Sequence, residues 1–355
     1  MPLPTVLLHD HLDGGLRVAT VLELADTYGY SDLPHWDEGD LAAWFDQSTS
    51  GSLETYLQAF THTIAVMQHH EALERVAYET AIDLAADGVV YAEIRFCPAL
   101  HTGGDLTHQE VIEAVSGGLR RGAAETGLEW RIIIDALRQL DHSMAMVRLA
   151  ADSTGLGVVG FDLAGPEAPY PPTDHLAACR FARGAGLRLT LHAGEAAGAR
   201  GVSYIASAMD VCGAERLGHG IEVIDDCVVE DGEITALGPV AQRVLDRQVP
   251  LEVCPSSNLA TRRIDPEDHP VGALHRAGFN VTINTDNRLM SATSMSAELR
   301  LVEKYHGFEV DDLALVARRS LGAAFCDHAT KVDLWERVIA PAYLSAGATL
   351  DRRWR

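Results

Sequence analysis

Residues 71–96, EALERVAYETAIDLAADGVVYAEIRF, show the pattern that decides the fold: a helical stretch runs into an almost continuous apolar strand. Strands that are apolar on both faces are typical of a parallel sheet covered by helices. Further apolar runs lie at 5–10, 130–137, 157–163, 187–192, 215–219, 249–254 and 279–285, and further helical stretches at 108–126 and 173–185. Eight strands in a chain of 355 residues predict an α/β fold, a (β/α)8 TIM barrel, with a doubly wound sheet as the alternative.

Two segments depart from the simple alternation of strand and helix. Residues 14–86 are long and mostly helical, so we expect a helical insertion after the first strand, acting either as a lid or as ordinary packing helices. Residues 221–239 carry an Asp231-Gly232 turn between two apolar alternations, which predicts a surface hairpin. With both segments included, we expect residues 1–355 to form a single barrel domain.

The composition excludes several classes of protein. The net charge of −23 repels phosphate backbones, so we expect a small uncharged substrate and no nucleic-acid polymer. No apolar run is long enough to cross a membrane, and no basic leader precedes the first one. The six cysteines form no CxxC pair and are typical of a reducing compartment. We therefore expect a cytoplasmic protein without a membrane partner, and its oligomeric state is left open.

Chemically reactive residues follow several of the predicted strands. His9 and His11 in HDHLDG lie two apart, so on a strand they share one face about 6.5 Å apart, although an HxH pair alone is as often structural. His192 and Glu195 (HAGE), His219 (GHG) and Asp286 (NTDN) follow the fifth, sixth and eighth strands. In a barrel these strand ends face one mouth, where active sites lie. Three imidazoles and a carboxylate there suit Zn²⁺.

Other metal chemistries fit the sequence less well. A two-metal site bridged by a modified lysine needs a lysine on a strand, but Lys304 and Lys331, the two lysines, follow the last predicted strand. A zinc deaminase of the H-x-E…P-C-x-x-C type is excluded as well, since CPSSN (254–258) lacks the second cysteine. One metal ion per chain is therefore favoured.

The sequence resembles the adenosine deaminase family through most of its length. The segments that carry the resemblance are HDHLDG (9–14), SLETYLQAF (52–60), VVYAEIRFCP (89–98), DLAG (162–165), HAGE (192–195), RLGHG (216–220), EVCPSSN (252–258) and NTDN (284–287), in the order of the family. The resemblance implies a (β/α)8 barrel with one zinc ion. It also implies hydrolytic deamination of adenosine and 2′-deoxyadenosine, which releases ammonia and leaves inosine or 2′-deoxyinosine.

The resemblance also implies roles for individual residues. Glu195 is implied to be the general acid that protonates the purine N1, and His219 to support the attacking hydroxide, which Asp286 also contacts. Zinc lowers the pKa of bound water from 15.7 to about 7, so hydroxide exists at neutral pH. The four implied metal ligands are His9, His11, His192 and Asp286.

Four residues are implied to contact the substrate: His11, Asp13, Gly165 and Asn287. Asp13 is implied to bind ribose hydroxyls, where adenine deaminases carry a longer Glu, so it favours a nucleoside over the free base. The Gly165 N–H is implied to donate to the purine N3. Asn287 replaces the family's second aspartate, near N7, and an amide can donate there directly. Pro166-Glu167 replaces an acidic pair, so we expect a different pocket rim.

Some alternatives stay open at this point. Tyr56, Leu57 and Phe60 either line an apolar wall near the sugar or pack in the core. The substrate is adenosine or another 6-aminopurine: adenine, aminodeoxyfutalosine or another 5′-modified adenosine such as methylthioadenosine. An inactive homologue that binds zinc or a nucleoside is a third possibility, which the presence of Glu195 and His219 argues against.

Overall fold

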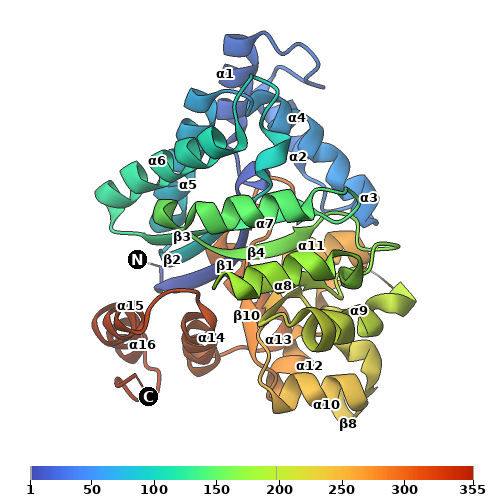
Figure 1. The fold of residues 1–355 in the computed structure, drawn as a ribbon. Helices are drawn as coiled ribbons and strands as arrows, with labels where there is room; N and C mark the ends of the chain where they lie inside the picture. Colours follow the sequence, from blue (N-terminus) through green and yellow to red (C-terminus); the bar gives the residue numbers. More distant parts are fainter. Residues whose placement is uncertain (1, 197, 355) are drawn as a thin grey trace.

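Eight parallel strands form a sheet that closes into a barrel, in a computed structural model that describes residues 2–196 and 198–354 (Figure 1). The strands are β1 (Thr5–His11), β2 (Val89–Phe96), β3 (Glu129–Leu137), β4 (Val158–Ala164), β5 (Arg188–Ala193), β6 (Arg216–His219), β9 (Leu251–Val253) and β10 (Val281–Ile283). Each strand pairs with the next in chain order. A doubly wound sheet would reverse its strand order at a switch point, so the predicted barrel is confirmed and its alternative is wrong.

The chain closes the barrel at the end of the first strand. The Asp286 N–H donates to the His9 carbonyl at 2.9 Å, and the His11 N–H donates to the Asp286 carbonyl at 2.8 Å. Asp286 has a positive φ of 58°, so it turns the chain away from the direction of β10. For this reason β10 ends at Ile283, before the predicted residue 285, and the closing contact involves the residues expected to hold the metal.

The helices cover the barrel from outside, as the apolar strands require. The first five lie between β1 and β2, where the insertion was expected, and α1 to α4 gather at the top of Figure 1. They are α1 (Val18–Tyr28), α2 (Glu38–Phe45), α3 (Leu53–Tyr56), α4 (Phe60–Val66) and α5 (His70–Ala86).

The remaining helices follow the later strands or form the C-terminal layer. They are α6 (His108–Thr126), α7 (Ser143–Asp152), α8 (Leu176–Gly184), α9 (Gly201–Ser207), α10 (Pro239–Asp246), α11 (Pro255–Arg262), α12 (Val271–Arg276), α13 (Met295–His306), α14 (Val310–Ala323), α15 (His328–Leu334) and α16 (Ala340–Ser345). A helix predicted over 173–185 begins as a 3-10 turn, Pro172–His175, before α8.

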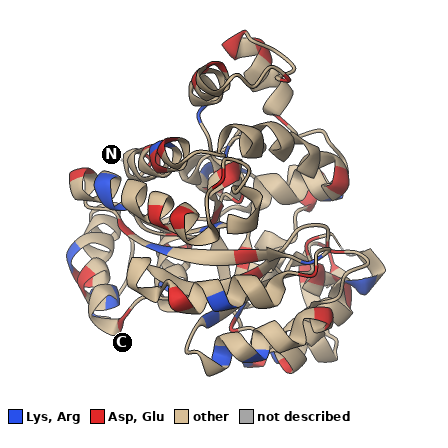
Figure 2. Ribbon diagram, turned by 45° about the horizontal axis from the view of Figure 1, so that its top comes forward, with Lys and Arg blue, Asp and Glu red and all other residues tan. Residues whose placement is uncertain are grey.

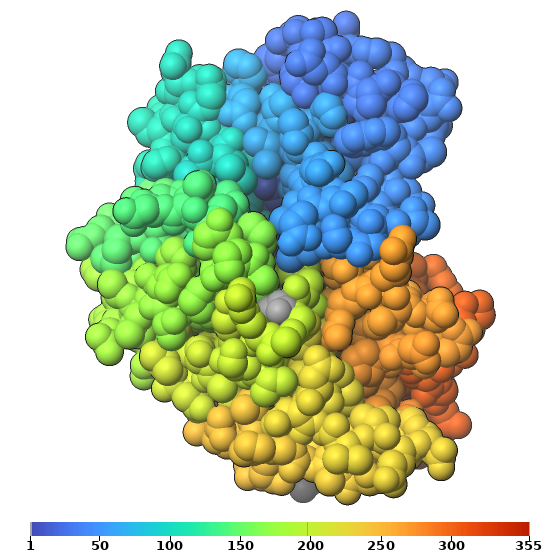
Figure 3. Space-filling view, turned by 90° about the vertical axis from the view of Figure 1, so that its right-hand side faces the viewer, coloured from blue at the N-terminus to red at the C-terminus, as the bar shows by residue number. Residues whose placement is uncertain are grey.

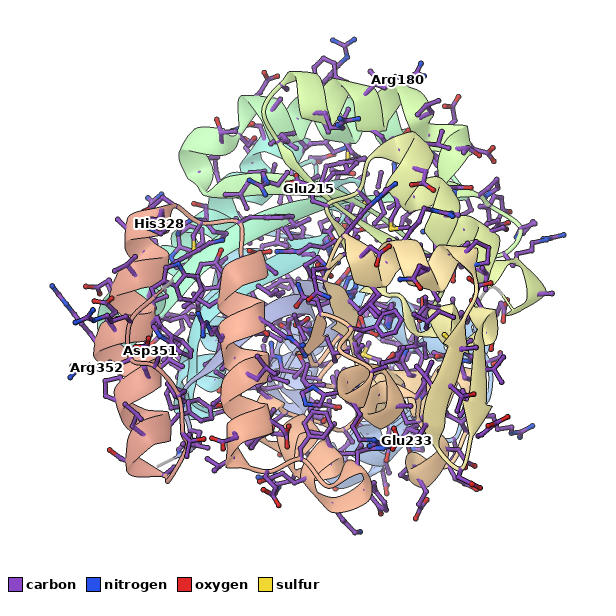
Figure 4. All side chains as sticks on the ribbon, turned by 90° about the horizontal axis from the view of Figure 1, so that it is seen from below. Arg180, Glu215, Glu233, His328, Asp351 and Arg352 are labelled. Carbon is purple, nitrogen blue, oxygen red and sulfur yellow. The ribbon has the colours of Figure 1, made fainter. Side chains whose placement is uncertain are left out.

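The predicted hairpin lies at the edge of the barrel. β7 (Cys227–Glu230) and β8 (Glu233–Leu237) pair antiparallel through Asp231 and Gly232, which both have positive φ angles, 52° and 78°. Figure 4 labels Glu233 at this hairpin, where its carboxylate accepts a hydrogen bond from Arg276 of α12 at 2.6 Å. The first part of the predicted segment, Ile221–Asp226, is a 3-10 helix instead of a strand.

Charged residues lie mainly on the outer helices. Figure 2 shows Asp and Glu spread over these helices, with Lys and Arg between them. Among the described residues, no helix has both the length and the apolar character that a membrane span needs.

Candidate active site

The four expected metal ligands lie together at the C-terminal end of the strands. His9 and His11 come from β1, His192 from β5 and Asp286 from the turn after β10, and their ligand atoms all lie within 4.8 Å of one another. Asp286 Oδ1 lies 3.3 Å from Nε2 of both His9 and His11. The strand alternation that puts the two histidines on the inner face turns Asp10 outward, where Arg288 donates to it at 2.9 Å. Tertiary structure therefore unites residues that are up to 277 positions apart.

Carboxylates lie beside two of the imidazoles. His9 Nδ1 lies 2.9 Å from Glu252 Oε2, and His192 Nδ1 lies 2.8 Å from Asp162 Oδ2. Since a carboxylate accepts, each Nδ1 carries the proton and leaves the Nε2 lone pair for the cluster.

A third carboxylate stands in the same relation to His11, whose Nδ1 lies 3.4 Å from Asp135 Oδ2. His9 Nε2 is buried and has no hydrogen-bond partner among the described residues, as expected of an atom that binds a cation. Three imidazole nitrogens with a carboxylate oxygen are a donor set that suits zinc, so the residues present fit this ion.

A buried network of charges forms the floor below these histidines. Glu252 accepts hydrogen bonds from Arg95 at 2.7 Å, Arg216 at 2.6 Å and Thr190 at 2.8 Å, besides facing His9. Although burial alone would raise the pKa of Glu252, the guanidinium groups of Arg95 and Arg216 hold it well below its ordinary value. The carboxylate therefore stays ionised and orients His9.

Sequence reasoning missed this floor. The signal for it was present in VVYAEIRF, where Glu93 and Arg95 alternate on one face of a strand that is otherwise apolar. A charged residue that is fully buried needs a partner, so such a pair predicts an ionic network inside the barrel.

Glu195 and His219 lie beside the cluster, as the sequence predicted. Their closest approach is 3.7 Å, between Glu195 Oε1 and His219 Nε2. Burial, together with the carboxylates of Asp286 and Glu167, raises the pKa of Glu195 well above its ordinary value, so its surroundings favour the protonated carboxyl. His219 and Asp286 both take the left-handed conformation, φ 59° and 58°, which is uncommon outside glycine and typical of functional turns.

Glu167 holds the loop that carries Glu195. Its carboxylate accepts from the backbone N–H groups of Gly194, Glu195 and Ala196, at 2.6, 2.9 and 3.0 Å. The sequence had placed Pro166-Glu167 at the pocket rim, and Pro166 does line the cavity. Glu167, however, is only 1 % exposed because its carboxylate turns under the loop. It is a positioning residue and not a rim residue.

A cavity lies in front of the cluster, under the insertion. Figure 3 shows the insertion, in blue, lying against the green and orange segments of the barrel. Tyr56, Leu57 and Phe60 line this cavity, and Tyr56 and Phe60 also pack in or against the hydrophobic core, so the two alternatives hold together. The cavity is also lined by eight of the nine expected site residues: His11, Asp13, Gly165, His192, Glu195, His219, Asp286 and Asn287. The ninth, His9, lies behind them and is fully buried.

Two residues that line the cavity have unsatisfied polar atoms. Asp13 Oδ1 and Asn287 Oδ1 are buried without a hydrogen-bond partner among the described residues. Asp13 Oδ2 lies 3.7 Å from Nε2 of His101, another residue that sequence reasoning missed. Buried polar atoms of this kind are normally satisfied, so they are the expected contacts of a polar ligand.

Comparisons with known proteins agree with this geometry. The family model described as adenosine deaminase matches residues 4–341. Adenosine deaminase 1 of Streptomyces coelicolor is 46 % identical over 358 residues, which cover 99 % of this chain and 89 % of that protein.

Solved structures show the same fold. The adenine deaminase of Arthrobacter aurescens superposes with a TM-score of 0.86 at 27 % identity, covering 98 % of this chain and all of that one. An amidohydrolase of Burkholderia ambifaria with bound zinc has a TM-score of 0.83 at 25 % identity, covering 97 % and 91 % of the two chains.

Proposed function

The chain belongs to the adenosine deaminase family of metal-dependent aminohydrolases, and from this membership and its site geometry we propose zinc-dependent deamination of adenosine and 2′-deoxyadenosine. The products are inosine or 2′-deoxyinosine and ammonia. The observation that carries the proposal is one cavity that joins the ligand cluster, Glu195 with its raised carboxyl pKa, and an unsatisfied Asp13. The first two suit removal of an amine by water, and the third suits a sugar hydroxyl.

Each residue then has a chemical task. His9, His11, His192 and Asp286 would hold one zinc ion, and the zinc bound in the Burkholderia relative supports this choice of metal. When bound, zinc lowers the pKa of water to about 7 and so supplies hydroxide at neutral pH.

The remaining groups act on the purine and on the attacking oxygen. Glu195 supplies the proton that the purine N1 receives as C6 is attacked, and its raised pKa favours the protonated carboxyl that this role needs. His219, which lies beside Glu195, orients the attacking oxygen, helped by Asp286. The Gly165 N–H donates to N3 and Asn287 contacts N7, while Asp13 binds a ribose hydroxyl.

We propose that the chain is one barrel domain and that 53–60 closes the sugar end of the cavity, supported by Tyr56 and Phe60 in its lining. The six cysteines are all unpaired, which supports a reducing, cytoplasmic location. The cavity combines a mainly apolar lining with a few polar groups, among them Asp13 and Asn287, which supports a purine nucleoside as the ligand.

A second candidate is deamination of another 6-aminopurine, because the Arthrobacter structure is that of an adenine deaminase. A panel of adenosine, 2′-deoxyadenosine, adenine, aminodeoxyfutalosine and methylthioadenosine on zinc-loaded protein separates the two. We expect adenosine to have the highest kcat/KM. If any of the last three is turned over at least about tenfold better, by 1.4 kcal/mol, the narrower proposal is wrong.

Asp13→Ala tests whether Asp13 binds the ribose of the substrate. Loss of a hydrogen bond to a charged group costs about 1.5–3 kcal/mol, so kcat/KM for adenosine should fall by about 10- to 150-fold. Any activity on adenine should stay the same, because the free base has no hydroxyl to bind. An equal loss on both substrates would show that Asp13 acts on the site as a whole.

Glu195→Gln tests the role of Glu195 as the general acid. The amide cannot deliver the carboxyl proton, so kcat should fall by about 10²- to 10⁴-fold. Zinc content, measured by elemental analysis, and binding of a ground-state nucleoside should be unchanged. Substantial residual turnover would remove Glu195 from this role.

A further inference from the structure

A chain of hydrogen bonds runs from His219 away from the cavity. Nδ2 of Asn258, on α11, lies 3.0 Å from His219 Nδ1. Oδ1 of the same amide lies 3.4 Å from Nε2 of His269, and the backbone N–H of Val271 donates to His269 Nδ1 at 3.1 Å. The side chains of His219, Asn258 and His269 are at most 3 % exposed, so water does not compete for these bonds. We call these four residues the His219 relay.

The backbone amide gives the relay a single direction. An N–H group can only donate, so Val271 requires a lone pair on His269 Nδ1. Burial lowers the pKa of His269 to about 3, which keeps this ring neutral and puts its one proton on Nε2. That proton is donated to Asn258 Oδ1. The NH₂ group of Asn258 therefore points at His219 and requires a lone pair on His219 Nδ1.

The opposite orientation of the Asn258 amide would leave an unfavourable contact between His269 and Val271. An amide turned by 180° would donate to His269 Nε2 and accept from His219 Nδ1. His269 would then carry its proton on Nδ1, where it would face the N–H of Val271, so two donors would meet in a buried site. Leaving buried donors unpaired costs about 1–3 kcal/mol for each group.

We propose that Asn258 and His269 are positioning residues that hold His219 as the tautomer with its proton on Nε2. His219 Nε2 is buried and has no partner among the described residues, and it faces the cavity beside Glu195. The fixed proton makes this atom a preorganised donor toward the attacking oxygen. This inference rests on the proposed function for its catalytic consequence, although the tautomer itself does not depend on it.

The same proton keeps His219 out of the metal site. His219 lies next to the cluster, with its ring centroid 4.9 Å from that of His9 and 5.3 Å from that of His192. A lone pair on Nε2 would add a further nitrogen ligand at the position that water needs. A catalytic zinc site depends on such an open position, so the relay protects it.

The test is ¹⁵N NMR of the zinc-loaded protein labelled at its histidines, with the His219 signals assigned by their loss in His219→Gln. We expect His219 Nε2 to have the shift of a protonated ring nitrogen and Nδ1 that of an unprotonated one. Asn258→Asp has the same shape but only accepts, so His219 should carry its proton on Nδ1 instead of Nε2. We expect kcat for adenosine to fall by about 10²-fold, as for loss of one oriented donor, with KM little changed.

A pair of variants that keep an aromatic ring isolates the far end of the relay. His269→Phe removes the donor to Asn258, so the amide can turn over and His219 should become a mixture of both tautomers, with kcat lowered by about two- to tenfold. His306→Phe is the matched control, because His306 is half-buried with its ring centroid 6.1 Å from that of His269 but lies outside the relay. It should leave both the His219 signals and kcat unchanged.

Each outcome decides one point. A proton on His219 Nδ1 in the parent protein overturns the inference, and so does an unchanged His219 spectrum in Asn258→Asp. If Asn258→Asp does not fold, His269→Phe and its control His306→Phe decide. Equal His219 spectra in these two variants also overturn the inference. An Nε2 proton in a protein that does not turn over adenosine would refute the proposed function and leave the relay intact.

Discussion

Glu252→Gln removes the negative charge at the centre of the buried ionic network below the histidines, without changing the shape of the side chain. Glu252 faces one guanidinium on each oxygen: Arg95 on Oε2, together with His9, and Arg216 on Oε1, together with Thr190. A glutamine has one acceptor, so in either orientation its NH₂ group meets two groups that donated to the native carboxylate. One of the two is always an arginine.

The size of the effect follows from these four contacts. Each hydrogen bond lost to a charged group costs about 1.5–3 kcal/mol, and breaking a buried ion pair by removing one partner costs about 3–5 kcal/mol. We therefore expect the free energy of unfolding of the metal-free protein to fall by about 3–5 kcal/mol, a large part of the usual 5–15 kcal/mol. Since His9 loses its carboxylate partner, zinc affinity should also fall by about 10- to 100-fold.

Two assays measure these effects separately. Urea unfolding in the presence of a chelator gives the stability of the metal-free protein, and competition with a chromophoric chelator gives the zinc affinity of the folded protein. Glu113→Gln, on the exposed face of α6, is the matched control and should stay within about 0.5 kcal/mol of the parent. If Glu252→Gln also stays within this range and binds zinc as the parent does, the buried network does not hold the site.

Two further changes test parts of the site outside the floor. Burial raises the pKa of Glu298 from 4.5 to about 7, so the folded state keeps a proton that the unfolded state releases, and stability falls as pH rises through this window. Glu298→Gln stays neutral, so urea unfolding should show a gain of about 3 kcal/mol at pH 8 and little gain at pH 5; an equal effect at both pH values would contradict this. Gly14→Ala would place a Cβ 2.1 Å from Asn287 Oδ1, which displaces Asn287 from the purine end of the cavity. Steady-state kinetics should show KM for adenosine raised by about tenfold with unchanged zinc content, and an unaltered KM would exclude Asn287 as a substrate contact.

The sequence alone was sufficient for the architecture. Runs such as Gly88–Phe96 identify buried parallel strands because both faces of each strand meet apolar neighbours, and that requirement appears in the local composition. The Asp231-Gly232 pair likewise identified the hairpin, since a tight turn needs residues that accept positive φ. The end of β10 was misplaced because Asp286 turns there to close the barrel against β1, a contact that no local pattern contains.

For the candidate site, too, some features follow from the sequence and others only from the tertiary structure. Sequence determined which side chains face the barrel mouth, because strand periodicity and the common direction of parallel strands place His9, His11 and His192 there. Tertiary structure alone decided the partners of these groups: Glu252 is 243 residues from His9 in the chain, and Asn258 is 39 residues from His219. Protonation, tautomer and ionic pairing depend on distances of a few ångströms in a dry interior, and chain order does not encode those distances. The cluster of candidate metal ligands was therefore visible in the sequence. The charges and hydrogen-bond partners around it became visible only in the folded barrel.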